Sequence, residues 1–160
     1  MIDTVVLEEG MTSVGEMAFD GCTHMSSVTL PTTLTKIESF AFSECDSLES
    51  ITIPEGVTTI GANPFVGCSS LSTVTFESED IFKCEEGMIV TANGETLISY
   101  LETKDDMKIV LPLSITTIGS HAIYGNQYLN TIILNHTITT IEDSGIAYCP
   151  NLDNVYHLDT

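Results

Sequence analysis

The 160-residue sequence lacks tryptophan and arginine and has only four lysines, so its 23 acidic residues leave a formal net charge of −19. Nucleic-acid-binding proteins neutralise phosphates with Lys and Arg, and this chain has almost none to offer. The same shortage disfavours binding to an anionic membrane surface. We therefore expect no nucleic-acid partner, and we expect the acidic residues to keep an extended protein soluble.

Long apolar runs are also missing. No stretch approaches the ~18 residues that a membrane-spanning helix needs, so no membrane insertion is predicted. The N-terminus has neither the basic nor the apolar region of a signal peptide. Val5 and Leu7 already occupy strand positions without a polar cap before them, whereas repeat arrays normally carry capping units. We therefore expect the chain to be a fragment of a longer protein.

Motifs that carry chemistry are absent as well. The sequence has no calcium-loop pattern, no H-E-x-x-H, no G-x-S-x-G and no cysteine or histidine spacing typical of zinc. A Ser-His-Asp site assembled by the fold stays an alternative, but the four histidines follow no period: they are His24, His121, His136 and His157. We predict that the protein is not an enzyme, with no catalytic, metal-binding or cofactor-binding residues and no cofactor.

What the sequence does contain is an interval of 23 residues that organises most of the chain. Residues 42–65 show one unit between two phenylalanines: FSECDSLESITIPEGVTTIGANPF. Positions one interval apart match: Phe19, Phe42 and Phe65; Cys22, Cys45 and Cys68; Val5, Val28, Ile51 and Val74; Leu7, Leu30, Ile53 and Phe76. Such a period is typical of a solenoid, in which each unit buries its apolar face against its neighbours.

Each copy is expected to contain two strand-like pieces. In residues 48–53 apolar side chains alternate with Ser50 and Thr52, as in a half-buried strand, and Pro54 closes the piece. Between the pieces, A-F-x-x-C allows about one turn of helix at most. The second piece is shorter, and in three copies it ends at a glycine where we expect a positive φ: Gly15, Gly61 and Gly119.

The predicted organisation is a single solenoid domain over 1–160, in an α/β class that is mostly β. About five stacked repeats are expected, with one insertion of 12 residues beyond a full period between Phe76 and Leu111. The predicted boundaries are 1–10 (partial), 11–31, 34–54, 57–76, 115–134 and 138–160 (partial), with the insertion and its hairpin at 77–108.

The insertion contains a hairpin signal. Residues 88–101, MIVTANGETLISYL, are two apolar runs joined by Asn93-Gly94, a pair typical of a two-residue type I′ turn. The expected pairing places Val90 and Leu97 on one side, and three apolar residues near the other: Ile89, Ile98 and Tyr100. The hairpin either packs on the solenoid or presents an apolar contact surface.

Five cysteines raise the question of disulfides. Four share one repeat position: Cys22, Cys45, Cys68 and Cys149. Stacked neighbours with parallel Cβ vectors lie ~4.8 Å apart, beyond the ~3.5–4.5 Å that a disulfide prefers. We predict buried, reduced thiols that pack as small apolar groups. Cys84, in the insertion, has no partner in this row and is the thiol we expect to be most reactive.

The units resemble the BspA type of leucine-rich repeat, known from bacterial and protozoan surface proteins. The matching residues are C-S-S-L-S-T-V-T-F at 68–76, C-D-S-L-E-S-I-T-I-P at 45–54 and V-T-T-I-G-A-N-P-F-V-G-C at 57–68. The resemblance implies a right-handed leucine-rich-repeat solenoid, extracellular or cell-surface localisation, and adhesion-type binding to proteins or glycans on host or neighbouring cells. It implies no catalytic residues.

The outward strand positions are the candidates for binding, because repeat proteins use their extended faces in this way. One outward row begins with Val6, Thr29, Thr52 and Thr75 and turns apolar at Val110, Ile133 and Tyr156. The candidate surface consists of Lys108, Val110, Thr131, Ile133, Asn154 and Tyr156, with Ile89, Ile98 and Tyr100 of the hairpin as a weaker candidate. A neighbouring loop that covers the apolar row is the alternative.

Two functions follow from these features. In the first, the chain is a non-catalytic binding module of a cell-surface or secreted adhesin-like protein. In the second, it is a structural spacer or self-assembling stalk, with end-to-end self-association, whose specificity lies in other domains. A run of near-identical repeats favours the spacer, whereas a face whose chemistry changes along its length favours binding.

Overall fold

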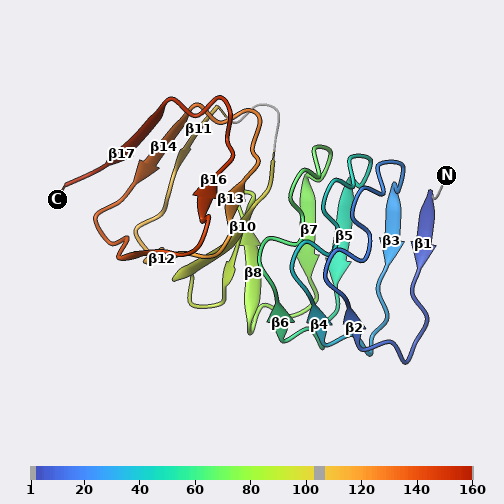
Figure 1. The fold of residues 1–160 in the computed structure, drawn as a ribbon. Coiled ribbons are helices and arrows are strands. Elements are labelled where there is room, and N and C mark those ends of the chain that lie inside the picture. The colour runs from blue at the N-terminus through green and yellow to red at the C-terminus, as the bar shows by residue number, and fades with distance from the viewer. Residues whose placement is uncertain (1–2, 103–106, 160) are drawn as a thin grey trace.

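The computed structural model describes residues 3–102 and 107–159, and their regular elements are all strands (Figure 1). The longer outward-facing strands recur along the solenoid: β1 (Thr4–Val6), β3 (Ser27–Thr29), β5 (Ser50–Ile53), β7 (Thr73–Phe76), β11 (Lys108–Val110), β14 (Thr131–Leu134) and β17 (Asn154–His157). The shorter second strands are β2 (Ser13–Val14), β4 (Lys36–Ile37), β6 (Thr59–Ile60), β12 (Thr117–Ile118) and β15 (Thr140–Ile141). A third, short position is occupied by β13 (Ile123–Tyr124) and β16 (Ile146–Ala147).

Neighbouring strands pair in parallel with a register of one repeat. Thr4 lies opposite Ser27, Ser50 opposite Thr73, and Thr131 opposite Asn154. These pairs join residues 23 apart, so the sequence period is the spacing of the backbone ladder; beside the insertion, β10 (Thr96–Tyr100) and β12 pair at a spacing of 21. The predicted solenoid is therefore confirmed.

The predicted phenylalanine ladder is present in the N-terminal half. The rings of Phe19 and Phe42 stack with centroids 5.4 Å apart, and those of Phe42 and Phe65 with centroids 5.7 Å apart. Stacked rings at this separation stabilise the folded state by more than the burial of their apolar area alone. In the C-terminal half the same position holds Ile123 and Ile146, which pair directly.

The cysteines are free thiols, and three of them, Cys45, Cys68 and Cys149, donate a hydrogen bond to a carbonyl of the preceding repeat. Cys45 Sγ donates to the Phe19 carbonyl at 3.2 Å, and Cys68 Sγ donates to the Phe42 carbonyl at 3.0 Å. Burial raises the pKa of the half-buried Cys84 thiol. It also raises the pKa values of Cys22 and Cys149, so a lowered pKa does not set Cys84 apart, and its higher reactivity stays a prediction.

The A-F-x-x-C segments form hydrogen-bonded turns instead of a helical turn. In the first copy, Asp20 N–H donates to the Met17 carbonyl at 3.1 Å, and Cys22 N–H donates to that of Phe19 at 3.1 Å. Met17 has a φ of 54° and Gly21 a φ of 70°, and two left-handed residues so close together prevent a helix from continuing.

The prediction of a positive φ at Gly15, Gly61 and Gly119 is wrong. The left-handed residues lie two and six positions later in the repeat: Met17, Phe40, Asn63, His121 and Ser144 in one row, and Gly21, Glu44, Gly67, Gly125 and Tyr148 in the other. A close approach of the preceding repeat explains two of the predicted glycines. A Cβ on Gly61 would lie 2.4 Å from Ser39 N, and one on Gly119 would lie 2.7 Å from the Leu97 carbonyl oxygen.

The insertion adds an antiparallel meander of β8 (Phe82–Glu85), β9 (Met88–Thr91) and β10 (Thr96–Tyr100). The predicted opposition of Val90 and Leu97 is confirmed. β10 also pairs in parallel with β12, where Leu97 lies opposite Ile118. β10 is therefore the second strand of a repeat as well as half of a hairpin, and the described residues contain six second strands instead of the five that the predicted repeats supply.

The hairpin turn differs from the prediction. Gly94 N–H donates to the Thr91 carbonyl at 2.7 Å, and Gly94 has a φ of 73° while Asn93 is not left-handed. The type I′ geometry needs a positive φ at both central residues. That geometry occurs at the preceding turn, where Glu86 and Gly87 have φ of 50° and 74° between β8 and β9.

The insertion divides the core in two. Ile89 of β9 belongs to the N-terminal core, whereas its neighbours Met88 and Val90 belong to the C-terminal core. The second strands likewise form separate sheets, β2–β4–β6 and β15–β12–β10–β9–β8. Figure 1 shows the meander between the two runs of outward-facing strands.

Polar side chains connect the two halves. The Asn63 amide nitrogen donates to the His121 carbonyl at 2.9 Å, and the Ser99 hydroxyl donates to Asn63 Oδ1 at 2.6 Å. Asn63 and Ser99 are both buried, so these bonds satisfy groups that water cannot reach.

The stacked ladder predicts a large cost for removing its central ring. We expect Phe42→Ala to lower the free energy of unfolding by about 3–5 kcal/mol, because Phe42 is fully buried between two other rings. Urea denaturation would measure the loss. Ser50→Ala, at an exposed position, is the control and should change the free energy of unfolding by no more than about 0.5 kcal/mol. A loss below about 1 kcal/mol would contradict the stacking.

The glycine contacts give a matched pair of variants. Gly15 and Gly61 occupy the same repeat position, but an added Cβ at Gly15 meets nothing within 4 Å. We expect Gly61→Ala to destabilise the protein by about 1–3 kcal/mol through overpacking. Gly15→Ala should be neutral or stabilise it by up to about 1 kcal/mol. Equal melting curves for both variants would refute the close-approach explanation.

Candidate binding surface

The C-terminal outward strands form a three-stranded parallel sheet in the order β11–β14–β17 (Figure 1). Val110 lies opposite Ile133, and Ile133 lies opposite Tyr156. Beside this line, Lys108 lies opposite Thr131 and Thr131 opposite Asn154. The structure thus brings together the six residues of the main candidate surface, which we call the β11–β14–β17 face.

The apolar line of this face is open to solvent. Val110 and Tyr156 are 55% and 52% exposed, and Ile133 between them is half-buried. Neither Val110 nor Tyr156 is covered by a loop. The Tyr156 hydroxyl donates to Asn154 Oδ1 at 3.3 Å, so the polar and apolar rows meet at the last strand.

The hairpin residues named as a weaker candidate do not form a contact surface. Ile89 is fully buried, Tyr100 is 7% exposed, and Ile98 is half-buried. β9 and β10 lie between the two cores, so both sides of the hairpin pack inside the molecule. The prediction for Ile89 and Tyr100 is therefore wrong, because these residues hold the two halves of the solenoid together.

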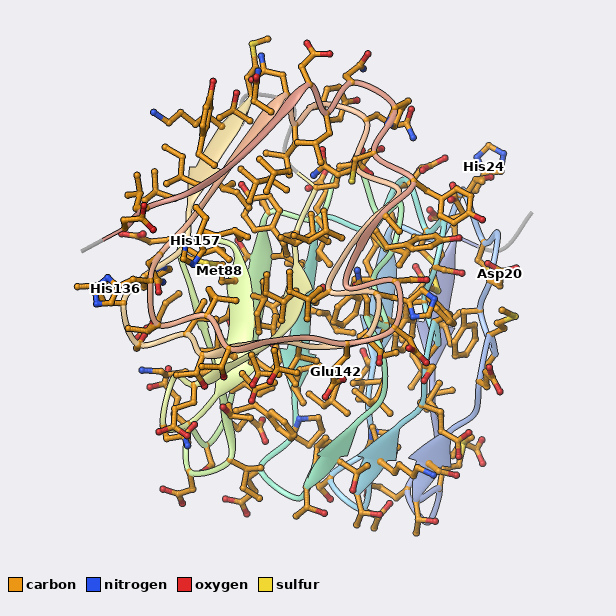
Figure 2. All side chains as sticks on the ribbon, turned by 60° about the vertical axis from the view of Figure 1, so that its left-hand side comes forward. Asp20, His24, Met88, His136, Glu142 and His157 are labelled. Carbon is orange, nitrogen blue, oxygen red and sulfur yellow. The ribbon has the colours of Figure 1, made fainter. Side chains whose placement is uncertain are left out.

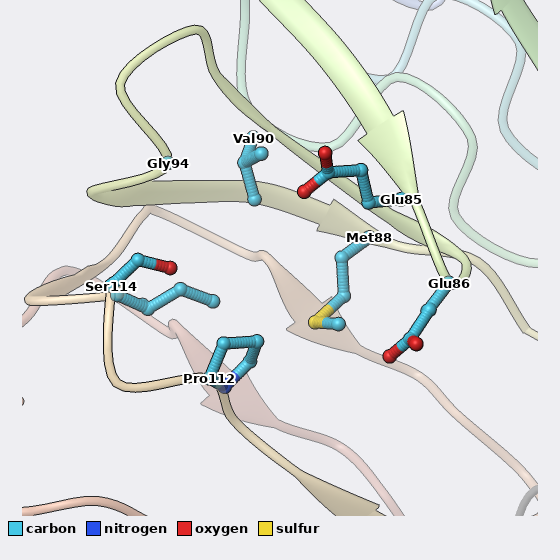
Figure 3. A pocket seen from close by; sticks show the side chains of 8 residues that line it. Glu85, Glu86, Met88, Val90, Gly94, Pro112 and Ser114 are labelled. Carbon is cyan, nitrogen blue, oxygen red and sulfur yellow. The ribbon is translucent and has the colours of Figure 1, made fainter.

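The structure adds a cleft that sequence reasoning missed. Its volume is about 540 Å³, and it lies between the β8–β9–β10 meander and the connection from β11 to β12 (Figure 3). The lining residues of this hairpin cleft are Glu85, Glu86, Met88, Val90, Gly94, Pro112, Ser114 and Ile115. They come from segments that only the fold brings together, so no local motif signals the cleft.

The side chains that could support catalysis or hold a metal ion are not gathered into a site in the described part of the chain. Figure 2 shows His24 and His136 on opposite sides of the molecule. Within residues 3–102 and 107–159, no three or more His, Cys, Asp or Glu side chains are arranged to hold a metal ion. The described chain also contains no helix long and apolar enough to cross a membrane.

One buried carboxylate lies near the junction of the halves. Glu102 is 7% exposed, and its Oε1 accepts a hydrogen bond from Gln127 N–H at 2.6 Å. Burial raises the pKa of Glu102, with smaller contributions from the charges of Glu44 and Asp46, while the Gln127 bond opposes the rise. Sequence patterns gave no sign of this group.

Comparison with known families matches the chain to the BspA type leucine-rich repeat region, in six copies over residues 1–97 and 99–159. The comparison with curated proteins found no match.

Solved structures give a consistent result. A leucine-rich cell surface protein from Faecalibacterium prausnitzii is 34% identical, with a TM-score of 0.80 over 96% of this chain and 41% of its own. The pneumococcal vaccine antigen PcpA is 25% identical, with a TM-score of 0.83 over 96% of this chain and 39% of its own. A leucine-rich repeat protein from Eubacterium ventriosum, 18% identical over 98% of this chain and 60% of its own, shares the fold with a TM-score of 0.61. This chain thus spans about two fifths of the first two proteins.

The buried Glu102 predicts a pH dependence of stability. Because its pKa is raised in the folded state, the folded state holds this proton more tightly, and the free energy of unfolding falls as the pH rises from the ordinary glutamate value of ~4.3 through the raised one. Glu102→Gln keeps an acceptor for Gln127 N–H without the charge. At pH 7 we expect this variant to unfold at a higher urea concentration than the wild type. Below about pH 4 we expect both proteins to unfold at the same urea concentration.

Exposed Glu79→Gln is the control for this variant, since it makes the same change of charge in a solvated position. Equal stabilisation by both variants at pH 7 would show that only the net charge matters. Destabilisation by Glu102→Gln at pH 7 would contradict the prediction.

Proposed function

The chain belongs to the BspA-type leucine-rich repeat family, and on this premise we propose that it is a non-catalytic binding module of a cell-surface or secreted, adhesin-like protein. It recognises a protein or a glycan through the β11–β14–β17 face. The F. prausnitzii relative is a cell surface protein, which supports the proposed localisation of this chain.

The observation that carries the proposal is the change of chemistry along one outward row. In β3, β5 and β7 this row presents exposed Thr29, Thr52 and Thr75, residues suited to a plain solvated strand. In β11, β14 and β17 the same row presents Val110, Ile133 and Tyr156 instead. A solvated face needs no apolar side chains, so an apolar line at this position favours a contact with a partner.

The polar row beside this line fits the edge of an interface. Lys108 and Asn154 are exposed and Thr131 is half-buried, so a cation, a hydroxyl and an amide border the apolar line. Contact surfaces commonly combine an apolar centre that includes tyrosine with a polar rim. The face is a sheet of parallel strands with no convergent group of titratable residues, which favours binding over catalysis.

The test compares variants at one repeat position in the two halves of the chain. Ile133→Asp places a charge in the centre of the apolar line, and Ile133→Thr restores the residue type that β5 carries there. Thr52→Asp makes the same charge change on exposed β5. Binding to purified extracellular-matrix proteins and mucins would be measured by surface plasmon resonance, and glycans would be screened on an array.

We expect Ile133→Asp to weaken binding by at least about tenfold, as for a central interface residue. Ile133→Thr should weaken it less, and Thr52→Asp should leave it unchanged. Circular dichroism would confirm that all three variants fold. Unchanged binding by Ile133→Asp, or equal loss with Thr52→Asp, would remove this face as the site.

A further inference from the structure

The hairpin cleft has an apolar floor. Met88 and Val90 of β9 are 7% and 4% exposed, and Ile115 is 1% exposed. These three residues belong to the C-terminal core, so rigid packing holds the floor in place. Pro112 lies in the same connection as Ile115 and faces Met88 and Val90 across the cleft (Figure 3). The floor therefore offers contact to an aliphatic segment of a ligand.

One edge of the cleft is acidic. Glu85 ends β8 and Glu86 begins the following turn, and in Figure 3 their side chains extend on either side of Met88. Glu85 Oε1 forms an ion pair with Lys83 Nζ at 3.0 Å. In the part of the chain that the structure describes, no basic side chain lies within ion-pair distance of Glu86. An uncompensated carboxylate therefore stands beside an apolar floor.

Two turns border the cleft, and its floor is part of the packed C-terminal core. Glu86 and Gly87, both left-handed, form the turn at the acidic edge. At the other end Gly94 lies beside Ser114, where an added Cβ would be in van der Waals contact, 3.4 Å from the hydroxyl oxygen. A site held in shape before binding loses little conformational entropy when a ligand enters.

From this arrangement we propose that the hairpin cleft binds a basic side chain, arginine or lysine, of a partner polypeptide. The aliphatic stem lies along Met88 and Pro112, and the charged end lies between Glu85 and Glu86. Long basic side chains pack in this way, with the stem on apolar surface and the charge at the solvent edge. The volume of about 540 Å³ is in the range of ligand sites and leaves room for a neighbouring apolar residue.

Electrostatics favours such a partner for this chain. Its net charge is −19, with four lysines and no arginine, so the field around the molecule attracts cations and repels acidic segments. The general field alone would not select a position, because exposed carboxylates occur all over the surface. The combination of Glu86 with a concave apolar floor is what distinguishes this position.

The test uses the full chain with ¹³C-labelled methionine methyl groups, because Met88 lies in the cleft and serves as the reporter. The probe is acetyl-leucyl-arginine amide, and its neutral counterpart is acetyl-leucyl-citrulline amide. We expect the arginine peptide to shift the Met88 signal saturably without shifting the other five methionines. The citrulline peptide should bind about three- to fivefold more weakly, the upper range for one solvated ion pair.

Two variants separate the parts of the site. Glu86→Gln should weaken the arginine peptide to the level of the citrulline peptide, whereas exposed Glu16→Gln should leave its affinity unchanged. Ser114→Phe, at an exposed rim position, should fill the cleft and abolish the Met88 response to both peptides. A Met88 signal that does not move, equal affinity for the two peptides, or equal effects of Glu86→Gln and Glu16→Gln would each overturn the proposal.

Discussion

The hydrogen bonds between residues one repeat apart are the constraint on which the rest of the molecule depends. Because the strands of the repeats pair in parallel with their equivalents in the next turn, side chains at the same repeat position lie beside one another. Phe42 consequently stacks between two phenylalanines, and the Cys68 thiol donates to the Phe42 carbonyl. The position of a residue within the repeat thus decides which equivalent side chains it lies beside.

The meander interrupts this ladder, and the continuous sheet and core that the ladder forms elsewhere are divided there. β10 keeps one second-strand pairing intact, but the sheet and the core are divided beside it. Individual side chains take over the role of the missing backbone bonds: Asn63 reaches the His121 carbonyl, and Ser99 reaches Asn63. Ile89, buried beside Met88 and Val90, ties the two cores to one strand.

Both proposed binding sites lie where the chain departs from the regular repeat, either in its outward residues or in its backbone. The β11–β14–β17 face keeps the regular backbone but replaces threonine with Val110, Ile133 and Tyr156. The hairpin cleft exists because the meander stands beside the β11–β12 connection, which leaves Glu86 above a buried apolar floor. The regular positions between them are explained by stacking, and they carry little information about a partner.

The sequence alone determined the solenoid, the register, the phenylalanine ladder, the opposition of Val90 to Leu97 and the alignment of Val110 with Ile133. These features follow from one translation repeated along the chain, so residues 23 apart reveal them. Only the tertiary structure decided that Ile89 is buried, that the backbone at Ser39 leaves no room for a Cβ at Gly61, and that Glu102 lies in the interior. These outcomes arise from the packing of neighbouring turns and of two half-cores across the insertion, and such contacts leave no period in the sequence.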